Sequence, residues 1–430
     1  MSTTATGSTN GTPRVLVTDP IAPDGIAYLR QHAQVDVVQE RLSPAELVAR
    51  IGEYAALIVR SETKVTREVI DAGRNLRVIG RAGVGVDNID VEAATRRGVV
   101  VVNAPAGNTI AVAEHTLGLL LALARSIPQA HAALRRGEWQ RSKYMGHEVR
   151  GKILGIIGLG RIGRAVARRA QGFEMRTIAY DPYVGAEQAR RLGVELVELP
   201  TLLRTADFVS IHTPATAHTQ GLIGAAELAL LKPTAFLINC ARGGIVDETA
   251  LTEALRAGRL AGAALDVFAQ EPPGDLPLLQ LDNVVATPHL AASTREAQVS
   301  VALEVAEQVV AVLNGQPALY AVNAPVVPPE VFATLGPYLR LCAMLGQLAT
   351  QLADGQHVSV EVTYAGEIAE QDIAVLQATV IRGLLAPISE EPVNLVNAPL
   401  IARQRGLRVS ERKTSAADNY TNLITVALRT

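Results

Sequence analysis

Short apolar runs alternate with amphipathic stretches along most of this chain. Between residues 14 and 108 the apolar runs are VLVT, VDVVQ, ALIVR, LRVIGRAG and VVVNAP, and segments such as PDGIAYLRQH and PAELVARIG have helical periodicity. Strands that alternate with helices are typical of a parallel sheet covered by helices. We therefore predict an α/β lobe in this region, followed by a long helix over residues 109–126.

A second stretch of the same kind centres on residues 152–181, KILGIIGLGRIGRAVARRAQGFEMRTIAYD. Its pattern predicts a strand at Ile153–Ile157, a glycine turn, a helix and a second strand at Arg176–Tyr180. The further runs that resemble strands lie at residues 194–198, 208–212, 235–240, 262–268 and 283–286. Helices separate most of these runs, so we predict a second doubly wound parallel sheet.

The turn GLGRIG has the spacing of a dinucleotide-binding loop. Gly158 permits a tight turn, Gly160 lets a pyrophosphate approach the backbone, and Gly163 lets the helix lie close to the strand. Asp181 ends the second strand 23 residues after Gly158, where a carboxylate accepts hydrogen bonds from the adenosine ribose. The same carboxylate repels a 2′-phosphate, and the following residues PYVGAE contain no Arg, so we expect NAD rather than NADP.

The expected carboxyl ends of the later strands carry residues suited to oxidising an alcohol by hydride transfer. Histidine titrates near neutrality, so His289 is a candidate acid/base, and a carboxylate such as Glu271 would fix its tautomer. Arg242 offers a planar fork that grips a carboxylate. Asp266 ends an apolar strand, where a buried charge needs a donor such as the nicotinamide amide.

The last third of the chain has a different pattern. A helix over residues 294–313 would return to the first lobe, and residues 314–329, rich in Pro, Gly and Asn, resemble a linker. Beyond the linker we predict a helix at residues 332–353, a strand in HVSVEVTYAG, a helix at residues 372–385 and a final strand in TNLITVAL. This pattern indicates a smaller α+β domain, and whether it lacks a closing strand stays open.

Composition limits the partners that the chain would have. Its 430 residues carry 40 basic and 42 acidic side chains, so no overall field favours nucleic acid or an anionic membrane. Two cysteines are too few for a disulfide framework and fit a reducing compartment. Residues 1–12 lack the features of a signal peptide and are expected to be disordered, which favours a cytoplasmic location. We expect no metal site.

Several motifs together resemble the D-isomer-specific 2-hydroxyacid dehydrogenases. They are GLGRIG, HTP, NCARGGIVDE, GAALDVF with EPP, and TPHLAAST. The resemblance implies that Arg242 binds the substrate carboxylate, Glu271 supports the histidine and His289 is the acid/base. It also implies an NAD site that, besides Gly158, Gly160 and Gly163, contains Val84, Arg161, Ile162, Asp181, Thr213, Cys240, Ala241, Asp266, Ala291 and Ala292.

Three further segments resemble those members of the family that oxidise 3-phospho-D-glycerate to 3-phosphooxypyruvate, the first step of the phosphorylated route to L-serine. These segments are RSETKV, GRAGVGVDNID and WQRSKYMG. A phosphorylated substrate needs a cationic pocket, and the last segment is similar to one that reaches into the partner subunit's site. We therefore expect a homodimer or homotetramer and expect substrate contacts from Arg60, Ser61, Lys64, Arg141 and Lys143.

Residues 319–430 are similar to the intervening regulatory domain, of the allosteric substrate-binding type, in the longer bacterial members. In those members a serine-binding ACT domain follows, whereas the present sequence ends at Thr430, so we expect activity to be insensitive to L-serine. A basic cluster expected near one loop would either bind an anion or form a solvated face. Its members are Arg403, Arg405, Arg408, Arg412 and Lys413.

The expected organisation is therefore two doubly wound parallel-sheet lobes followed by a smaller α+β domain. Residues 13–108 together with 293–318 would form a discontinuous substrate-binding domain, and residues 109–292 would form a Rossmann NAD-binding domain. Residues 319–430 would form the third domain, and whether this domain is truncated stays open. Two other functions remain open. They are a dehydrogenase of another small D-2-hydroxy acid, such as 2-hydroxyglutarate or glycerate, and a non-catalytic NAD-sensing protein.

Overall fold

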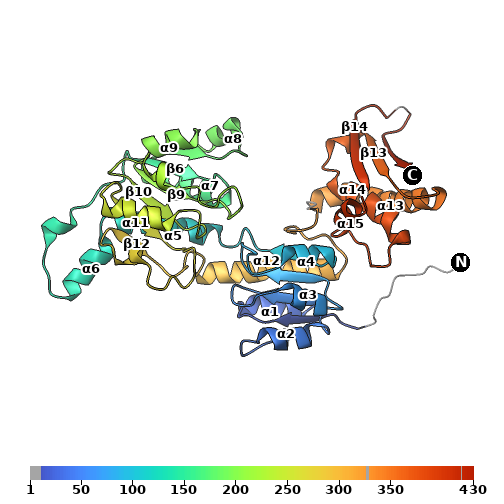
Figure 1. Ribbon diagram of the computed structural model, residues 1–430, viewed down its shortest axis with the longest axis horizontal. Helices are drawn as coiled ribbons and strands as arrows, with labels where there is room; N and C mark the ends of the chain where they lie inside the picture. Colours follow the sequence, from blue (N-terminus) through green and yellow to red (C-terminus); the bar gives the residue numbers. More distant parts are fainter. Residues whose placement is uncertain (1–10, 326–328, 418) are drawn as a thin grey trace. The chain divides into compact units, whose positions relative to one another are not determined.

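The computed structural model describes residues 11–325, 329–417 and 419–430 (Figure 1). Residues 1–10 of the expected disordered tail lie outside the described residues. The chain divides into two compact units, one formed by residues 106–298 and the other by the chain before residue 106 together with residues 299–430. Within the described residues these units contain a five-stranded, a seven-stranded and a three-stranded sheet.

The five-stranded sheet forms the first lobe and has the order β2-β1-β3-β4-β5, with every pair parallel. The apolar side chains of one face pack on α1 and α12, and those of the other face pack on α2, α3 and α4. The strands are β1 (Arg14–Val17), β2 (Gln34–Val37), β3 (Ala56–Val59), β4 (Val78–Arg81) and β5 (Val100–Asn103). The helices are α1 (Pro23–Arg30), α2 (Pro44–Ile51), α3 (Arg67–Ala72), α4 (Val91–Arg96) and α12 (Arg295–Leu313).

Helix α12 packs closely on the first lobe from Val299 onward. A Cβ atom at Gly25 would lie 2.7 Å from the carbonyl oxygen of Ala302, and one at Gly80 would lie 2.8 Å from a methyl group of Val305. After the helix, Ala321 pairs with Val102 of the edge strand β5. These contacts explain why a segment far away in sequence completes the core of this lobe.

The seven-stranded parallel sheet forms the second lobe, with the order β12-β11-β10-β9-β6-β7-β8. Helices α5, α7 and α8 cover one face and α9, α10 and α11 the other. The strands are β6 (Ile153–Ile157), β7 (Arg176–Tyr180), β8 (Glu195–Leu196), β9 (Phe208–Ile211), β10 (Phe236–Asn239), β11 (Gly262–Leu265) and β12 (Val284–Ala286). The helices are α5 (Thr109–Ala124), α6 (Ile127–Arg135), α7 (Arg161–Gly172), α8 (Ala186–Arg191), α9 (Leu199–Thr205), α10 (Ala225–Leu228) and α11 (Glu248–Arg256), with short 3₁₀ turns η1 (Arg141–Tyr144) and η2 (Pro277–Gln280).

The order of the second sheet reverses at β6, which lies between β7 and β9. Chain progression runs toward β8 on one side of this strand and toward β12 on the other, as in the dinucleotide-binding fold. Ligands bind such sheets outside the carboxyl ends of the strands at the reversal. Both predicted doubly wound lobes are therefore confirmed, and in the second lobe the strand at the reversal leads directly into the glycine turn.

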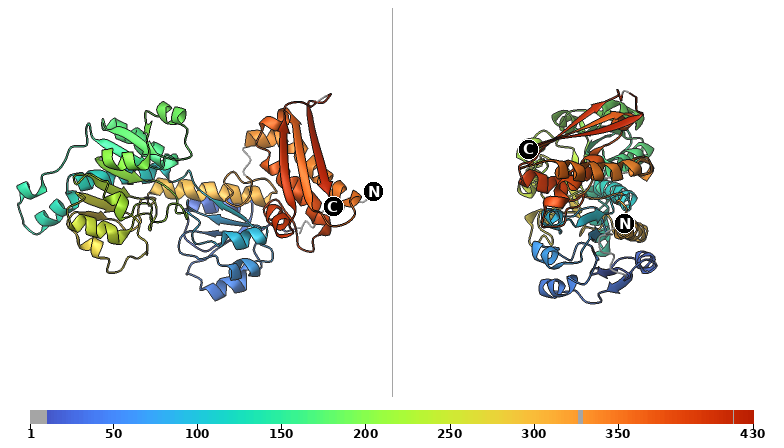
Figure 2. Two further views of the ribbon diagram at one scale, coloured as in Figure 1. Left: turned by 45° about the horizontal axis from the view of Figure 1, so that its top comes forward. Right: turned by 90° about the vertical axis from the view of Figure 1, so that its right-hand side faces the viewer.

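The third domain contains a mixed sheet of order β14-β13-β15, covered on one face by helices (Figure 2). Strand β13 pairs in parallel with β14 and antiparallel with β15. The predicted final strand is present as β15, so the described sheet has a strand on each side of β13. The elements are α13 (Pro329–Leu352), β13 (Ser359–Gly366), η3 (Glu367–Glu370), α14 (Ala374–Leu385), η4 (Ala386–Ile388), α15 (Ala398–Gln404), β14 (Arg408–Thr414) and β15 (Asn422–Arg429).

The basic residues that we expected near one loop extend from the end of α15, through the loop after it, along β14. Arg408, Arg412 and Lys413 lie on the edge strand β14, and Arg403 lies on α15. Most side chains of β14 are exposed, so its sequence RVSERKT lacks the apolar alternation that marks a half-buried strand. Two of the basic groups are also occupied, because Lys413 Nζ donates to the carbonyl of Gln371 and Arg405 donates to that of Ile388.

Among the described residues no single helix is long and apolar enough to cross a membrane, although α5 and α6, bent by 62°, would meet that requirement as a pair.

Candidate active site

The glycine turn has the geometry that a pyrophosphate site needs. Gly158 has a φ of +94°, and a Cβ atom there would lie 2.7 Å from the carbonyl oxygen of His212. A Cβ atom at Gly163 would lie 2.1 Å from the carbonyl oxygen of Gly158, so only glycine lets α7 approach β6. At Gly160 no atom lies within 4 Å of the Cβ position, which leaves the backbone at the start of α7 open to a ligand.

Asp181 directly follows β7. Because β6 and β7 are parallel, it lies at the same end of the sheet as the glycine turn that follows β6. Its Oδ2 accepts from the backbone N–H of Leu159 at 2.8 Å and its Oδ1 from that of Tyr183 at 2.8 Å. Each carboxylate oxygen has a further lone pair, so both can still accept from ribose hydroxyls. The turn and the acid are thus linked directly, and the residues present fit an NAD molecule.

Four buried polar atoms near the amino end of α5 and the carboxyl end of β9 have no hydrogen-bond partner in the described part of the chain. Burial lowers the pKa of His212 to about 3, so this ring is neutral, with its Nε2 2.8 Å from Ser210 Oγ. Buried polar groups without a protein partner are candidates for ligand contacts. The atoms are Asn108 Oδ1, Thr109 Oγ1, His212 Nδ1 and Thr213 Oγ1.

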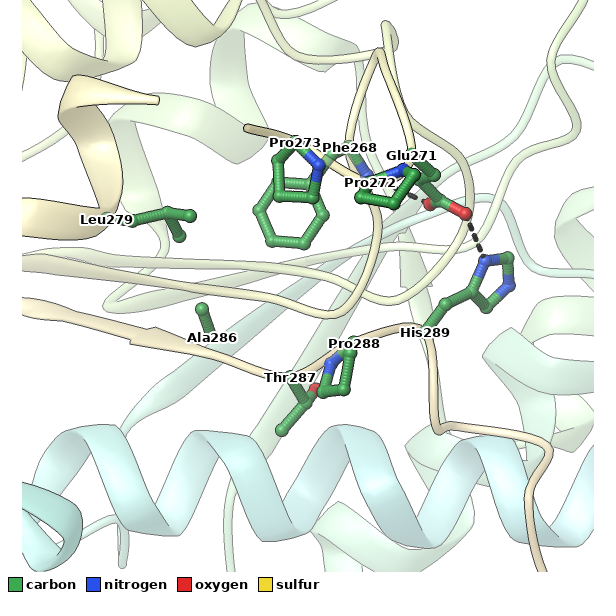
Figure 3. Close-up of a pocket in the computed structure, with 9 residues that line it drawn as sticks. All are labelled: Phe268, Glu271, Pro272, Pro273, Leu279, Ala286, Thr287, Pro288 and His289. Carbon is green, nitrogen blue, oxygen red and sulfur yellow. Dashed lines mark hydrogen bonds and ion pairs between the residues drawn. The ribbon is translucent and has the colours of Figure 1, made fainter. Parts of the chain in front are cut away.

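The structure brings Glu271 and His289 together. His289 Nδ1 lies 2.8 Å from Glu271 Oε2, and Figure 3 shows the two side chains pointing toward each other. The other carboxylate oxygen of Glu271 accepts from the backbone N–H of Phe268 at 3.1 Å. An ionised carboxylate can only accept, so Nδ1 carries the hydrogen and Nε2 remains for proton exchange with a substrate.

Asp266, at the end of β11, is fully buried. Its carboxylate accepts from the backbone N–H groups of Leu290 and Ala291, at 2.7 and 2.8 Å, and from Thr287 Oγ1 at 2.5 Å. Burial by itself raises the pKa of Asp266, but the hydrogen bonds from His115, Thr287 and the two backbone groups outweigh it and hold the pKa below its ordinary value. The protein therefore supplies donors of its own where the nicotinamide amide was expected.

His115 was missed in the sequence as a member of this network. It lies on α5, and its Nε2 is 3.1 Å from Thr287 Oγ1 and 3.4 Å from Asp266 Oδ1. Thr287 points toward that helix and away from His289 (Figure 3). The one signal in the sequence was a polar pair, Glu114 and His115, that interrupts an otherwise apolar helix.

Arg242 lies on the loop after β10, and Asn239 shapes that loop. The side chain of Asn239 accepts from the N–H of Ala241 at 3.0 Å and donates to the carbonyl of Arg242 at 3.0 Å. A Cβ atom at Gly243 would lie 1.8 Å from the carbonyl oxygen of Phe268, so this loop touches the one that leads to Glu271. The loop of Arg242, the candidate carboxylate-binding residue, therefore contacts the loop that carries Glu271, the partner of His289.

A cavity of about 500 Å³ opens beside His289 and Glu271. Apart from those two residues its walls are almost entirely apolar, as Figure 3 shows. The remaining lining residues are Phe268, Pro272, Pro273, Leu279, Ala286, Thr287 and Pro288.

The other predicted cofactor residues are distributed over three places. Arg161 and Ile162 form the first turn of α7, and Val84 follows β4 in the first lobe. Burial raises the pKa of the Cys240 thiol to about 12, so this side chain behaves as a small apolar group and not as a nucleophile. Cys240 and Ala241 follow β10, and Ala291 and Ala292 lie on the loop after His289.

The predicted substrate residues form two groups, one in each unit. Arg60, Ser61 and Lys64 share the loop between β3 and α3, whereas Arg141 and Lys143 lie on η1. No group of metal-ligating side chains occurs among the residues that the structure describes.

A dinucleotide fold with a hydrogen-bonded histidine–glutamate pair and an arginine at its strand ends is the arrangement expected of a nicotinamide-dependent dehydrogenase. The family model for the NAD-binding domain of the D-isomer specific 2-hydroxyacid dehydrogenases matches residues 117–291, and that for the D-3-phosphoglycerate dehydrogenase intervening domain matches residues 334–430. The chain belongs to the D-isomer specific 2-hydroxyacid dehydrogenase family, and NAD is its cofactor.

The relatives are similar over almost the whole chain. A D-3-phosphoglycerate dehydrogenase from Methanocaldococcus jannaschii is 50% identical over 414 residues, which cover 96% of this chain and 79% of that protein. The enzyme of that name from Bacillus subtilis is 43% identical and is covered to 78%. Among solved structures, the D-lactate dehydrogenase of Aquifex aeolicus complexed with NAD and lactic acid is 28% identical with a TM-score of 0.65, covering 73% of this chain and 99% of that one.

Replacing His289 by Ala should reduce turnover by about 100- to 10,000-fold, the usual contribution of general acid/base catalysis, and should leave NAD affinity nearly unchanged. Steady-state rates and fluorescence titration with NADH measure the two quantities. His32→Ala, a change of an exposed histidine in the first lobe, is the matched control. Near-normal turnover in the His289 variant would exclude this residue from proton transfer.

Replacing Asp181 by Ala should weaken NAD binding by roughly 10- to 100-fold, the effect of losing a hydrogen bond to a charged group, and should relax discrimination against NADP. The ribose acceptor and the repulsive charge disappear together in this variant. Titration with both cofactors measures the change. Glu195→Ala removes an exposed acid at β8 and should alter neither affinity, whereas unchanged NAD affinity in the Asp181 variant would place the ribose elsewhere.

Proposed function

We propose that this protein oxidises 3-phospho-D-glycerate to 3-phosphooxypyruvate with NAD, as the first step of the phosphorylated route to L-serine. The hydrogen-bonded pair of His289 and Glu271 beside the Arg242 loop is the observation that carries the proposal. It supplies the base and the carboxylate grip that oxidation of a 2-hydroxy acid requires. The relatives that are 43–50% identical and named D-3-phosphoglycerate dehydrogenase support this choice of substrate.

The proposed mechanism uses three residues of the second lobe. Arg242 binds the substrate carboxylate through its planar guanidinium group. His289 Nε2 removes the proton of the C2 hydroxyl, and the neighbouring Glu271 stabilises the imidazolium that forms. NAD, when bound, supplies the acceptor for the hydride from C2, and the open turn at Gly160 together with Asp181 would hold it.

The phosphate group is the feature that distinguishes this substrate from lactate or glycerate. We propose that Arg60, Ser61 and Lys64 supply one side of its pocket, since a divalent anion is bound best by several cationic and polar donors. Ser61 and Lys64 are exposed on their loop. Arg141 and Lys143 would supply the other side from a second copy of the chain.

The unmodified protein should show a higher kcat/KM for 3-phospho-D-glycerate than for D-lactate, D-glycerate or 2-hydroxyglutarate, followed by nicotinamide absorbance. Lys64→Met should lower kcat/KM for the phosphorylated substrate by about 10- to 100-fold, because one hydrogen bond between charged groups is lost. Arg74→Met, a change of an exposed cation after α3, is the control. Preference for an unphosphorylated substrate would contradict the proposal.

We propose a homodimer or homotetramer in which the segment from α6 to Met145 of one copy meets another copy. This segment carries Trp139, 77% exposed, and Met145, 84% exposed, beside Arg141 and Lys143. Large apolar side chains exposed together are typical of association surfaces. The apolar cavity beside His289 would be a suitable place for such a side chain of the partner.

Trp139→Ser should therefore shift the molar mass measured by light scattering from that of a dimer, or a multiple of it, toward that of the monomer. The physical reason is the loss of an aromatic anchor, and such anchors dominate interface energetics. Tyr420→Ser changes an exposed aromatic residue of the third domain and should leave the mass unchanged. A variant with unaltered mass would remove Trp139 from the subunit interface.

We also propose a cytoplasmic location and the domain division expected from the sequence, with residues 13–108 and 293–318, 109–292 and 319–430 as its parts. Two unpaired, buried cysteines support a reducing compartment. The packing of α12 against the first lobe supports the discontinuous domain. Cell fractionation and limited proteolysis, with cleavage sought near residues 314–329, test the two proposals.

A further inference from the structure

A buried carboxylate in the first lobe holds the loop that carries Arg60, Ser61 and Lys64. Asp19 lies two residues after the end of β1 and is only 3% exposed. Its Oδ2 accepts from the backbone N–H of Arg60 at 2.6 Å and from that of Thr63 at 3.1 Å, and its Oδ1 accepts from Thr63 Oγ1 at 2.5 Å. All three bonds end on one short loop.

Asn88 binds the backbone carbonyl groups of the same loop. Its Nδ2 donates to the carbonyl of Arg60 at 2.7 Å and to that of Thr63 at 2.6 Å. The backbone carbonyl of Asn88 also accepts from the N–H of Val65 at 2.8 Å. Asp19 and Asn88 together therefore satisfy both backbone polar groups of Arg60 and of Thr63, although neither residue of the loop belongs to a strand.

The backbone of the loop is fixed by these hydrogen bonds, whereas its polar side chains are largely exposed to solvent. Ser61 and Lys64 are exposed, and Arg60 is half-buried with its Nη1 3.2 Å from the carbonyl oxygen of Pro20. A loop that is ordered before a ligand arrives loses little conformational freedom on binding. The arrangement thus presents cationic donors from a backbone whose own hydrogen bonds are already made.

We infer that Asp19 and Asn88 are positioning residues for the phosphate of the substrate, acting through the loop of Arg60, Ser61 and Lys64. This inference rests on the proposed function and deepens it. Neither side chain is assigned a contact with substrate. A role limited to folding would affect every property of the enzyme alike, whereas positioning of this loop affects recognition of the phosphorylated substrate selectively.

The first experiment compares Asp19→Ala with Asp19→Asn in the full chain. The Ala variant loses all three acceptors, so KM for 3-phospho-D-glycerate should rise about tenfold, as expected when one charged hydrogen bond to the ligand is weakened. Asparagine keeps one oxygen for the two backbone N–H groups and its amide can donate to Thr63 Oγ1, so it should restore KM to within about threefold. In both variants kcat and KM for NAD should stay within about twofold of the unmodified protein, because hydride and proton transfer use other residues.

A second variant tests the hydrogen bonds to the carbonyl groups of the loop. It keeps the inference testable if Asp19→Ala does not fold. Asn88→Asp replaces a donor by an acceptor that faces two carbonyl oxygens, and it should raise KM for the phosphorylated substrate in the same selective way. The matched control is Asp36→Asn, which disturbs a hydrogen-bonded acid on β2 of the same sheet, bonded to Arg14 at 2.8 Å, and should leave KM unchanged.

Two outcomes would overturn the inference alone. One is an unmodified protein active on 3-phospho-D-glycerate whose Asp19 and Asn88 variants keep its KM. The other is a set of variants in which kcat and both KM values change together, which would indicate a role in folding only. Failure of the unmodified protein to oxidise 3-phospho-D-glycerate would instead overturn the proposed function, and this inference with it.

Discussion

The position of the loop after β12 in the second lobe depends on the hydrogen bonds that surround the buried carboxylate of Asp266. A carboxylate removed from water is costly unless donors surround it. Here the donors come from His115 on α5, from Thr287 after β12 and from the N–H groups of Leu290 and Ala291. One acid therefore joins a helix to the loop after an edge strand, and it determines where that loop, with His289 on it, must lie.

The backbone of His289 shows what this constraint achieves. Its φ is +53°, in the left-handed region that costs energy for a residue with a side chain. The N–H of His289 donates to the carbonyl of Asp266 at 2.9 Å, and the next two N–H groups bind the carboxylate. The turn is thus held on both sides of the strained residue, and it aims the imidazole at Glu271.

Much of the fold was predictable because its signals are local. The period of apolar residues, the GLGRIG turn and the acid at Asp181 each lie within a short window, and the structure has two doubly wound sheets with that turn at the point of reversal. His115 was not predictable, since its contact with Thr287 joins residues 172 positions apart. Strand β14 was missed for another reason, because its largely exposed faces need no apolar alternation.

Asp19 and Asp266 solve the same problem in the two lobes. Most of a loop after a parallel strand lies outside the hydrogen-bond ladder of the sheet, yet the binding residues on such loops must be ordered. In each lobe a buried acid at a strand end accepts from two backbone N–H groups of a neighbouring loop. Those four bonds use main-chain donors. Asp19 therefore does not occupy the side-chain donors of Arg60 and Lys64. An anionic substrate can bind these two side chains without competing with the buried carboxylate for them.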